Sequence, residues 1–240
     1  MTVTWEDLGW ERLAPGVGRC RLPGWDCTVG LVLGEGTALL VDAGSSLAEG
    51  ARLRAAVREL TGRDVTHLAL THPHFDHVFG AAAFAGAEVY AAVGLEAVLA
   101  HERAELRRDA IRNGLPAAEA DEAADVVSRP VHPVSGEWTL DLGGGRQALL
   151  ANVGPGHSAH DLAVLVPGTP EVVFCGDLVE ESGEPQAGPD AVPSRWPAAL
   201  DRLLALGGED ALYVPGHGAV VDAAFVRRQR DELAARFGVS

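Results

Sequence analysis

Two apolar runs near the start of the chain predict a β-hairpin. Residues 27–33 and 37–42 are mainly hydrophobic, and the turn-forming residues 34–36 separate them. Short apolar runs bounded by glycine are typical of paired strands. We therefore expect two antiparallel strands, the second ending at Asp42. The same pattern predicts further strands at residues 65–71, 88–92, 129–133, 137–141, 146–152, 161–166, 171–175 and 211–214.

Hydrophobic side chains at helical spacing predict the α-helices. In residues 47–60, Leu53, Val57 and Leu60 recur at i, i+4 and i+7, which places them on one helix face. Further helices are expected at residues 93–112, at residues 116–127, after a capping Ser194 with Pro197 in the first turn, and from Asp222 to about residue 236.

The order of these elements predicts an α/β fold. A strand–helix first half is followed by a strand-rich middle and a helix–strand–helix end. We expect two sheets sandwiched between helices, in a single domain over residues 1–240. Residues 180–195 are rich in glutamate, glycine and proline and are expected to form a loop.

The charge balance narrows the class of partner. The net charge is −15, and the sequence contains no lysine. Because nucleic acids are normally held by basic surfaces, we expect no nucleic-acid partner. The absence of lysine also excludes Schiff-base catalysis.

The sequence predicts a soluble, cytoplasmic protein with no membrane partner. No apolar run approaches the roughly 20 residues of a spanning helix. The first residues lack the basic start and the apolar run of a signal peptide. Cys20, Cys27 and Cys175 are an odd number and are expected to be reduced thiols.

The sequence Thr-His-Pro-His-Phe-Asp-His at residues 71–77 holds four potential metal ligands directly after a predicted strand. Residues two apart in extended backbone project to the same side, so His72 and His74 can share one ion. The chain must then turn, and Asp76 and His77 can face a second ion. Imidazole and carboxylate ligands of this kind suit zinc and related metals.

Three further candidate ligands follow in glycine-containing contexts. They are His157 in Gly-Pro-Gly-His-Ser, Asp177 in Phe-Cys-Gly-Asp and His217 in Val-Pro-Gly-His-Gly. Each lies in a turn or at the end of a predicted strand, where glycine lets the backbone approach an ion closely. Their occurrence in order after the main motif predicts that all belong to one site.

These motifs resemble those of the metallo-β-lactamase fold superfamily of hydrolases. The resemblance spans most of the chain, from the strand ending at Asp42 to His217, and the five motifs occur in the family order. It implies a four-layer αβ/βα sandwich of two mixed sheets flanked by helices, with the metals at one edge between the sheets.

The resemblance also implies a role for each ligand. Asp42 matches a buried aspartate that orients ligands rather than binding metal. By position, a first ion would be held by His72, His74 and His157, a second by Asp76, His77 and His217, and Asp177 would bridge the two.

Such a site predicts a binuclear metal-dependent hydrolase. Two divalent ions would lower the pKa of a bridging water and so give a hydroxide nucleophile at neutral pH. Zinc is the expected metal, and iron or manganese also suits this ligand set. Asp76 is expected to orient the attacking water. We expect a small-molecule substrate that is an ester, a thioester or a lactone.

The sequence argues against three other branches of the family. In its β-lactamases the position of Asp177 is usually cysteine or serine, and lysine often binds the drug. The glyoxalase II branch normally adds a helical domain, whereas few residues follow His217 here. The tRNA-processing branch conflicts with the acidic charge balance.

Two alternatives from other classes stay open. A mononuclear iron persulfide dioxygenase shares the scaffold but would leave the second ligand group without a role. A non-catalytic metal-binding domain would be expected to have a closed, cysteine-rich site.

Two more residues are candidates for the substrate pocket. His160 is a candidate catalytic residue that donates to a substrate oxyanion, and the alternative is a turn residue with local hydrogen bonds. Trp25 is a candidate wall of the pocket, and the alternative is simple surface packing.

Overall fold

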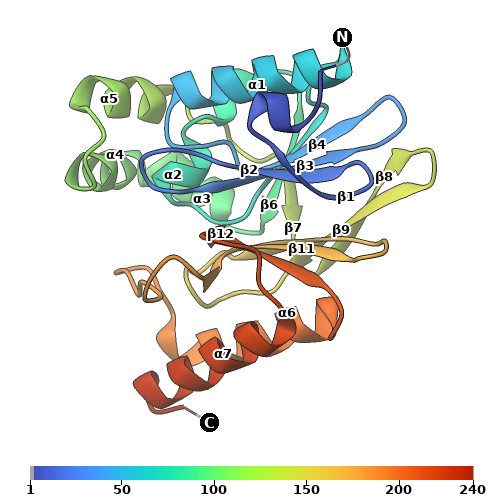
Figure 1. The fold of residues 1–240 in the computed structure, drawn as a ribbon. Helices are drawn as coiled ribbons and strands as arrows, with labels where there is room; N and C mark the ends of the chain where they lie inside the picture. Colours follow the sequence, from blue (N-terminus) through green and yellow to red (C-terminus); the bar gives the residue numbers. More distant parts are fainter. Residues whose placement is uncertain (1–2, 240) are drawn as a thin grey trace.

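The computed structural model describes residues 3–239 and has four layers, with helices outside two stacked β-sheets (Figure 1). One sheet has seven strands in the order β1-β2-β3-β4-β5-β6-β7, and the other has five in the order β12-β11-β10-β9-β8. Helices α1 to α5 cover the first sheet, while α6 and α7 cover the second. The predicted four-layer sandwich is confirmed.

The strands are β1 (Glu11–Ala14), β2 (Val17–Arg21), β3 (Thr28–Leu33), β4 (Ala38–Val41), β5 (His67–Leu70), β6 (Glu88–Ala92), β7 (His132–Val134), β8 (Glu137–Gly143), β9 (Arg146–Asn152), β10 (Leu162–Val166), β11 (Val172–Glu180) and β12 (Leu212–His217). The α-helices are α1 (Leu47–Thr61), α2 (Phe75–Val78), α3 (Leu95–His101), α4 (Arg103–Arg112), α5 (Ala117–Val126), α6 (Trp196–Gly207) and α7 (Ala223–Phe237). Within residues 3–239, three short 3-10 helices cover Glu6–Leu8, Ala81–Phe84 and Pro193–Arg195.

Both sheets are mixed, and strand alternation divides the core. Strands β1 to β4 pair antiparallel, whereas β4 to β7 run parallel, as do β11 and β12. In β4, Leu40 packs toward the helices, while Leu39 and Val41 pack between the sheets. This strand is buried on both faces, which explains its uninterrupted apolar run.

Most predicted elements are confirmed, with differences at their ends. The hairpin forms as β3 and β4, and Asp222 caps α7 by accepting a hydrogen bond from Phe225 N–H. The helix predicted over residues 93–112 is divided at Glu102 into α3 and α4. The predicted Ser194 cap is wrong, because Arg195 precedes α6 and no side chain caps that helix.

The second sheet differs from the sequence prediction at β11. This strand continues from the predicted 171–175 to Glu180, so Asp177 lies within it rather than after it. The extension contains bulges on either side of Gly176 against β12, and such irregular pairing leaves little apolar alternation to detect. Strands β1 and β2 have no counterpart among the predicted elements. Among residues 3–239, no helix has both the length and the apolar character to span a bilayer.

A close backbone approach joins α2 to the end of β4. Ala43 N–H donates to His77 O at 2.8 Å, and Gly80 N–H donates to Gly44 O at 3.0 Å. A Cβ atom at Gly80 would overlap the backbone of Ala43. The chain therefore requires glycine here to bring the 72–77 motif against Asp42.

We predict that Gly80→Ala destabilises the fold by about 1–3 kcal/mol, because the added methyl group must push two backbone segments apart. Gly136→Ala is the matched control, since its Cβ would meet open space and its φ is not in the left-handed region. It should change stability by no more than about 0.5–1 kcal/mol. Denaturant unfolding measures both, and equal effects would contradict the steric argument.

Candidate metal centre

Five separate segments converge at one edge between the two sheets. The segments are the end of β5, helix α2, the β9–β10 loop, the bulge in β11 and the end of β12. Their side chains form two groups of potential ligands that share Asp177. The structure thus brings together all seven residues predicted as metal ligands, namely His72, His74, Asp76, His77, His157, Asp177 and His217.

The first group consists of three imidazoles with Asp177. The rings of His72, His74 and His157 lie 4.7–4.8 Å apart between centroids and are nearly perpendicular to one another. His157 Nε2 is 2.9 Å from His74 Nδ1. Asp177 Oδ2 lies 3.5 Å from Nε2 of both His72 and His157. Three imidazole nitrogens and one Asp177 oxygen therefore face one point, as the ligands of a single metal ion would.

The second group lies on the other side of Asp177. His77 Nε2 is 3.5 Å from Asp76 Oδ2, and His217 Nε2 is 3.3 Å from the same oxygen. Asp177 Oδ1 is 3.2 Å from His77 Nε2, and Asp177 Oδ2 is 3.3 Å from His217 Nε2. The Asp177 carboxylate therefore contacts both groups, as a bridging ligand would.

These separations fit metal coordination. Bonds of 2.0–2.1 Å to a tetrahedral zinc ion place neighbouring ligand atoms roughly 3.3–3.4 Å apart. His72 Nε2 and Asp177 Oδ1 are buried and make no hydrogen bond among the described residues. Because buried polar atoms are normally satisfied, such atoms in a His/Asp cluster point to a bound cation.

Hydrogen bonds at the far side of the rings fix which nitrogen faces the metal. Asp42 accepts from Thr71 N–H at 2.8 Å, from Thr71 Oγ1–H at 2.7 Å and from His77 Nδ1–H at 2.9 Å. Thr71 Oγ1 is thereby left to accept from His72 Nδ1–H at 2.9 Å. In both histidines Nε2 is left free for the centre. Asp42 thus hydrogen-bonds to His77 directly and to His72 through Thr71, and it is not itself one of the predicted metal ligands.

The turn that carries His217 is held from two sides. His217 Nδ1 donates to Trp25 O at 2.7 Å, which leaves Nε2 for the centre. The buried Arg19 donates to Gly218 O at 2.8 Å, and Glu181 accepts from Ala219 N–H. These contacts join β2 and the loop after β11 to the ligand turn.

Asp190 orients His74, which the sequence alone did not reveal. His74 Nε2 lies 2.9 Å from Asp190 Oδ2, so Nδ1 faces the centre. Asp190 belongs to the loop between β11 and α6, far from His74 in the sequence. Nothing in the pattern distinguishes it from an ordinary loop aspartate.

Cys27 also lies closer to the centre than its sequence context indicates. Its thiol donates to Asp76 O at 3.1 Å and lies 3.7 Å from His77 Nδ1. Burial raises the pKa of this thiol to about 11, so the neutral form packs beside the ligands. All three cysteines are free thiols, as expected.

Glycine allows the close approach of β11 and β12 at Asp177. Gly176 adopts a left-handed φ of 54° at the bulge. A Cβ atom at Gly216 would overlap the Asp177 carboxylate, and one at Gly176 would press on Thr71. The small residue before each ligand is therefore a steric requirement.

Protons compete with metal at this centre. Burial lowers the pKa of His72 well below its usual value and that of His157 to about 4, so both rings are neutral and able to bind. Burial also disfavours a charged His217, but Asp177 and Asp76 outweigh it and raise its pKa to about 12. Metal binding would displace that proton, because a ligating imidazole must be neutral.

The metal-binding atoms open onto a cleft of about 400 Å³. Trp25 lines it, with its ring packed edge-to-face against Phe75 at 5.3 Å. Loop residues between 182 and 188 form another wall. His160 instead lines a neighbouring cavity, where its Nδ1 lies 2.9 Å from Val93 O. Its catalytic role stays a prediction.

We predict that Asp177→Ala and His72→Ala lose bound metal together with activity, because each removes a central ligand. Elemental analysis of protein purified without added metal measures this. The exposed His101 lies on α3 outside the site, so His101→Ala should keep its metal. Full metal content in Asp177→Ala would show that the ligand assignment is wrong.

We predict that Asp190→Asn weakens metal affinity about 10–100-fold, the usual cost of losing a carboxylate partner of a ligating histidine. Chelator competition measures it. Glu184→Gln is the control, since Glu184 lies in the same loop but pairs with Arg236. An unchanged metal affinity in Asp190→Asn would show that Asp190 does not support the metal ligand His74.

Comparison with known proteins agrees with this geometry. A model of the metallo-beta-lactamase superfamily matches residues 22–217. Metallo-beta-lactamase domain-containing protein 1 of Xenopus laevis is 28% identical over 195 residues, 80% of this chain and 71% of the relative. A metallo-beta-lactamase from Pontibacter korlensis has a TM-score of 0.72 at 20% identity, covering 93% of this chain and 97% of that one. The DIM-1 metallo-beta-lactamase has a TM-score of 0.73 at 17% identity, covering 95% and 97%. The chain therefore belongs to the metallo-beta-lactamase superfamily.

Proposed function

We propose that this protein is a binuclear metal-dependent hydrolase of a small ester, thioester or lactone. The observation that carries the proposal is the Asp177 carboxylate, whose oxygens face imidazole nitrogens of both ligand groups. A mononuclear centre would need only one of these groups. Zinc is the metal we propose, because the ligands are imidazoles and carboxylates at tetrahedral spacing.

The metal ions that these ligands would hold supply the chemistry of the proposed reaction. Divalent ions bound there would polarise a substrate carbonyl and lower the pKa of a bound water toward roughly 7, without any serine or cysteine nucleophile. Asp76 lines the cleft and contacts His77 and His217, so we assign its carboxylate to orient the attacking water and accept its proton. Trp25 limits the space for the substrate.

The two solved structures named above are β-lactamases, but at their level of identity the likeness supports the fold alone. The cleft provides no lysine, and aspartate occupies the position where those enzymes usually carry cysteine or serine. We therefore propose a substrate other than a β-lactam. The acidic charge balance supports a small molecule rather than a nucleic acid.

The persulfide dioxygenase alternative makes a different use of the same ligands. It would need one iron and would leave Asp76, His77 and His217 without a ligand role. Those three side chains are instead gathered as tightly as the first group, with separations of 3.3 and 3.5 Å between nitrogen and oxygen. This geometry favours the two-ion hydrolase.

We predict about two zinc ions per chain at full activity, with hydrolysis of activated thioesters or lactones and no β-lactam hydrolysis above background. Elemental analysis and a substrate panel test this, with Asp177→Ala as the inactive control. A chelator should abolish turnover, and added zinc should restore it. One iron per chain with oxygen consumption on a persulfide would overturn the proposal.

A further inference from the structure

His157 differs from the other ligand histidines in how its ring is held. The outward nitrogens of His72, His74, His77 and His217 each have a hydrogen-bond partner. His157 Nδ1 is buried and makes no hydrogen bond with any described residue. The orientation of this ring must therefore be set by packing and by the backbone of the loop that carries it.

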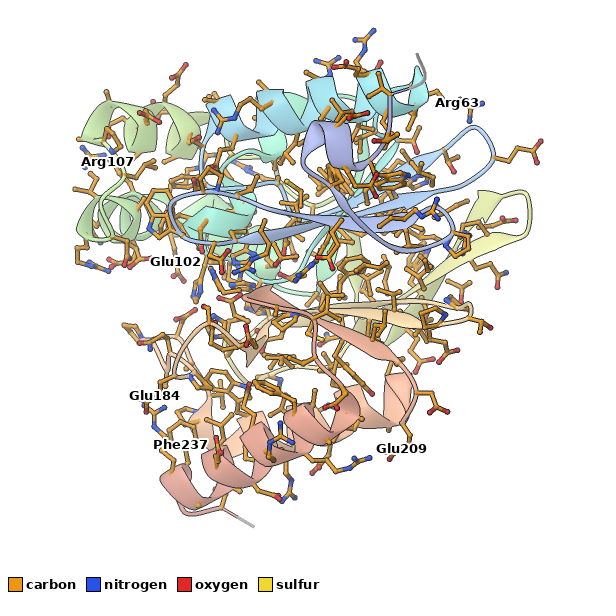
Figure 2. The ribbon with its side chains drawn as sticks, in the orientation of Figure 1. Arg63, Glu102, Arg107, Glu184, Glu209 and Phe237 are labelled. Carbon is orange, nitrogen blue, oxygen red and sulfur yellow. The ribbon has the colours of Figure 1, made fainter. Side chains whose placement is uncertain are left out.

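A buried tryptophan packs against the His157 ring. The Trp196 ring lies edge-to-face with it, with the centroids 5.3 Å apart. Trp196 is itself held in place, because its indole N–H donates to Leu178 O at 3.0 Å and its ring stacks on Phe237. Figure 2 shows Phe237 in the half of the molecule formed by the second sheet and its helices. This packing limits the room for the imidazole, but a displaced loop backbone would still carry its Nε2 away from the other ligands.

The buried Asp161, four residues after the ligand, fixes the backbone of this loop. Asp161 Oδ1 accepts from Ser158 N–H at 3.0 Å and from Ser158 Oγ–H at 2.7 Å. Ser158 Oγ in turn accepts from His160 N–H at 3.0 Å. Asp161 is 3% exposed and Ser158 is 0% exposed, so water does not compete for these bonds. They close a turn that begins directly after His157.

Backbone hydrogen bonds join the same residue to the start of the loop. Asp161 O accepts from Val153 N–H at 3.2 Å and from Gly154 N–H at 3.0 Å. Gly156 N–H donates to Ser158 O at 2.9 Å. The two ends of the loop therefore meet at Asp161, and His157 lies between them.

The Asp161 carboxylate is costly to bury. It makes no ion pair with any described residue, and burial raises its pKa to about 7. A buried carboxylate without a cation lowers stability unless hydrogen bonds compensate. The hydrogen bonds that it accepts come from Ser158, the residue next to the ligand. The carboxylate is therefore better explained by the loop geometry that it enforces than by a gain in stability.

We propose that Asp161 and Ser158 position His157 for metal binding, so that the affinity of the first ion depends on two residues outside the ligand set. This inference rests on the ligand role of His157 in the proposed function and does not depend on the substrate. Asp42 and Asp190 support other ligand histidines by direct side-chain contacts, whereas Asp161 acts through the loop backbone. Loss of the turn would displace His157 and leave the ligands of the second ion in place.

Matched serine variants test the turn. Ser158→Ala should weaken zinc binding by the first ion site about 10–100-fold, the usual effect of losing an outer partner of a ligand, and leave the second unchanged. Ser45→Ala is the matched control. Ser45 is also buried, and its N–H and Oγ–H donate to the buried Glu49 carboxylate at 2.8 and 2.7 Å. It should lower stability by a similar amount and keep both zinc affinities.

Chelator competition resolves the two zinc affinities, and the one that His157→Ala weakens belongs to the first ion. Denaturant unfolding measures stability in parallel. Equal zinc affinities in Ser158→Ala and Ser45→Ala, or an equal loss of both ions in Ser158→Ala, would overturn the proposal.

Asp161 variants grade the effect. Asp161→Ala leaves Ser158 N–H without its acceptor and should weaken the first ion more than Ser158→Ala does. Asp161→Asn keeps an acceptor oxygen and should recover part of that loss. The affinities are measured at about pH 8, above the pKa of Asp161. If Asp161→Ala does not fold, Asp161→Asn and Ser158→Ala decide, and an unaltered first-ion affinity in both would overturn the proposal.

A double-mutant cycle shows whether the effect passes through His157. In a His157→Ala chain the turn has no ligand to position, so adding Ser158→Ala should not weaken zinc binding further. A further loss equal to that in the unaltered chain would show a general structural role and overturn the proposal. Full zinc affinity in His157→Ala alone would instead refute the ligand set on which the proposed function rests.

Discussion

The shared Asp177 carboxylate is the constraint on which this structure depends. It lies buried between two sheets, with imidazoles from two loops, one helix and the end of β12 around it. A buried carboxylate oxygen without a hydrogen bond costs about 1–3 kcal/mol, so a cation bound at Asp177 would stabilise the fold. The same crowding makes the centre sensitive to protons, because burial lowers the pKa of His77 and His217 but the acidic groups around them outweigh it and raise the pKa of both imidazoles.

The fold meets this constraint by bringing backbone segments unusually close. Gly216 and Gly176 let β11 and β12 pass the carboxylate, and Gly80 lets helix α2 reach the end of β4. Asp42 then links both ends of the 71–77 motif through Thr71 and His77. Stability and site geometry are therefore set by the same contacts, and a change in one of these glycines acts on both.

The loop between β11 and α6 connects the centre to the substrate space. It supplies Asp190 to a metal ligand, while its residues from 182 to 188 form a wall of the cleft. Gly188 of this loop lines both the cleft and the neighbouring cavity that contains His160. The contact to the ligand His74 and one wall of the cleft consequently belong to the same irregular segment.

The sequence by itself determined the fold class, most strands and helices, and the set of candidate ligands, because periodicity and ligand spacing are local properties. It did not indicate β1, β2 or the extension of β11 through Asp177, where bulged pairing hides the alternation. It also did not indicate the contacts that Asp190 and Cys27 make at the centre. These groups act through neighbours distant in the chain, and only the packing of the two sheets and their loops decides which side chains meet.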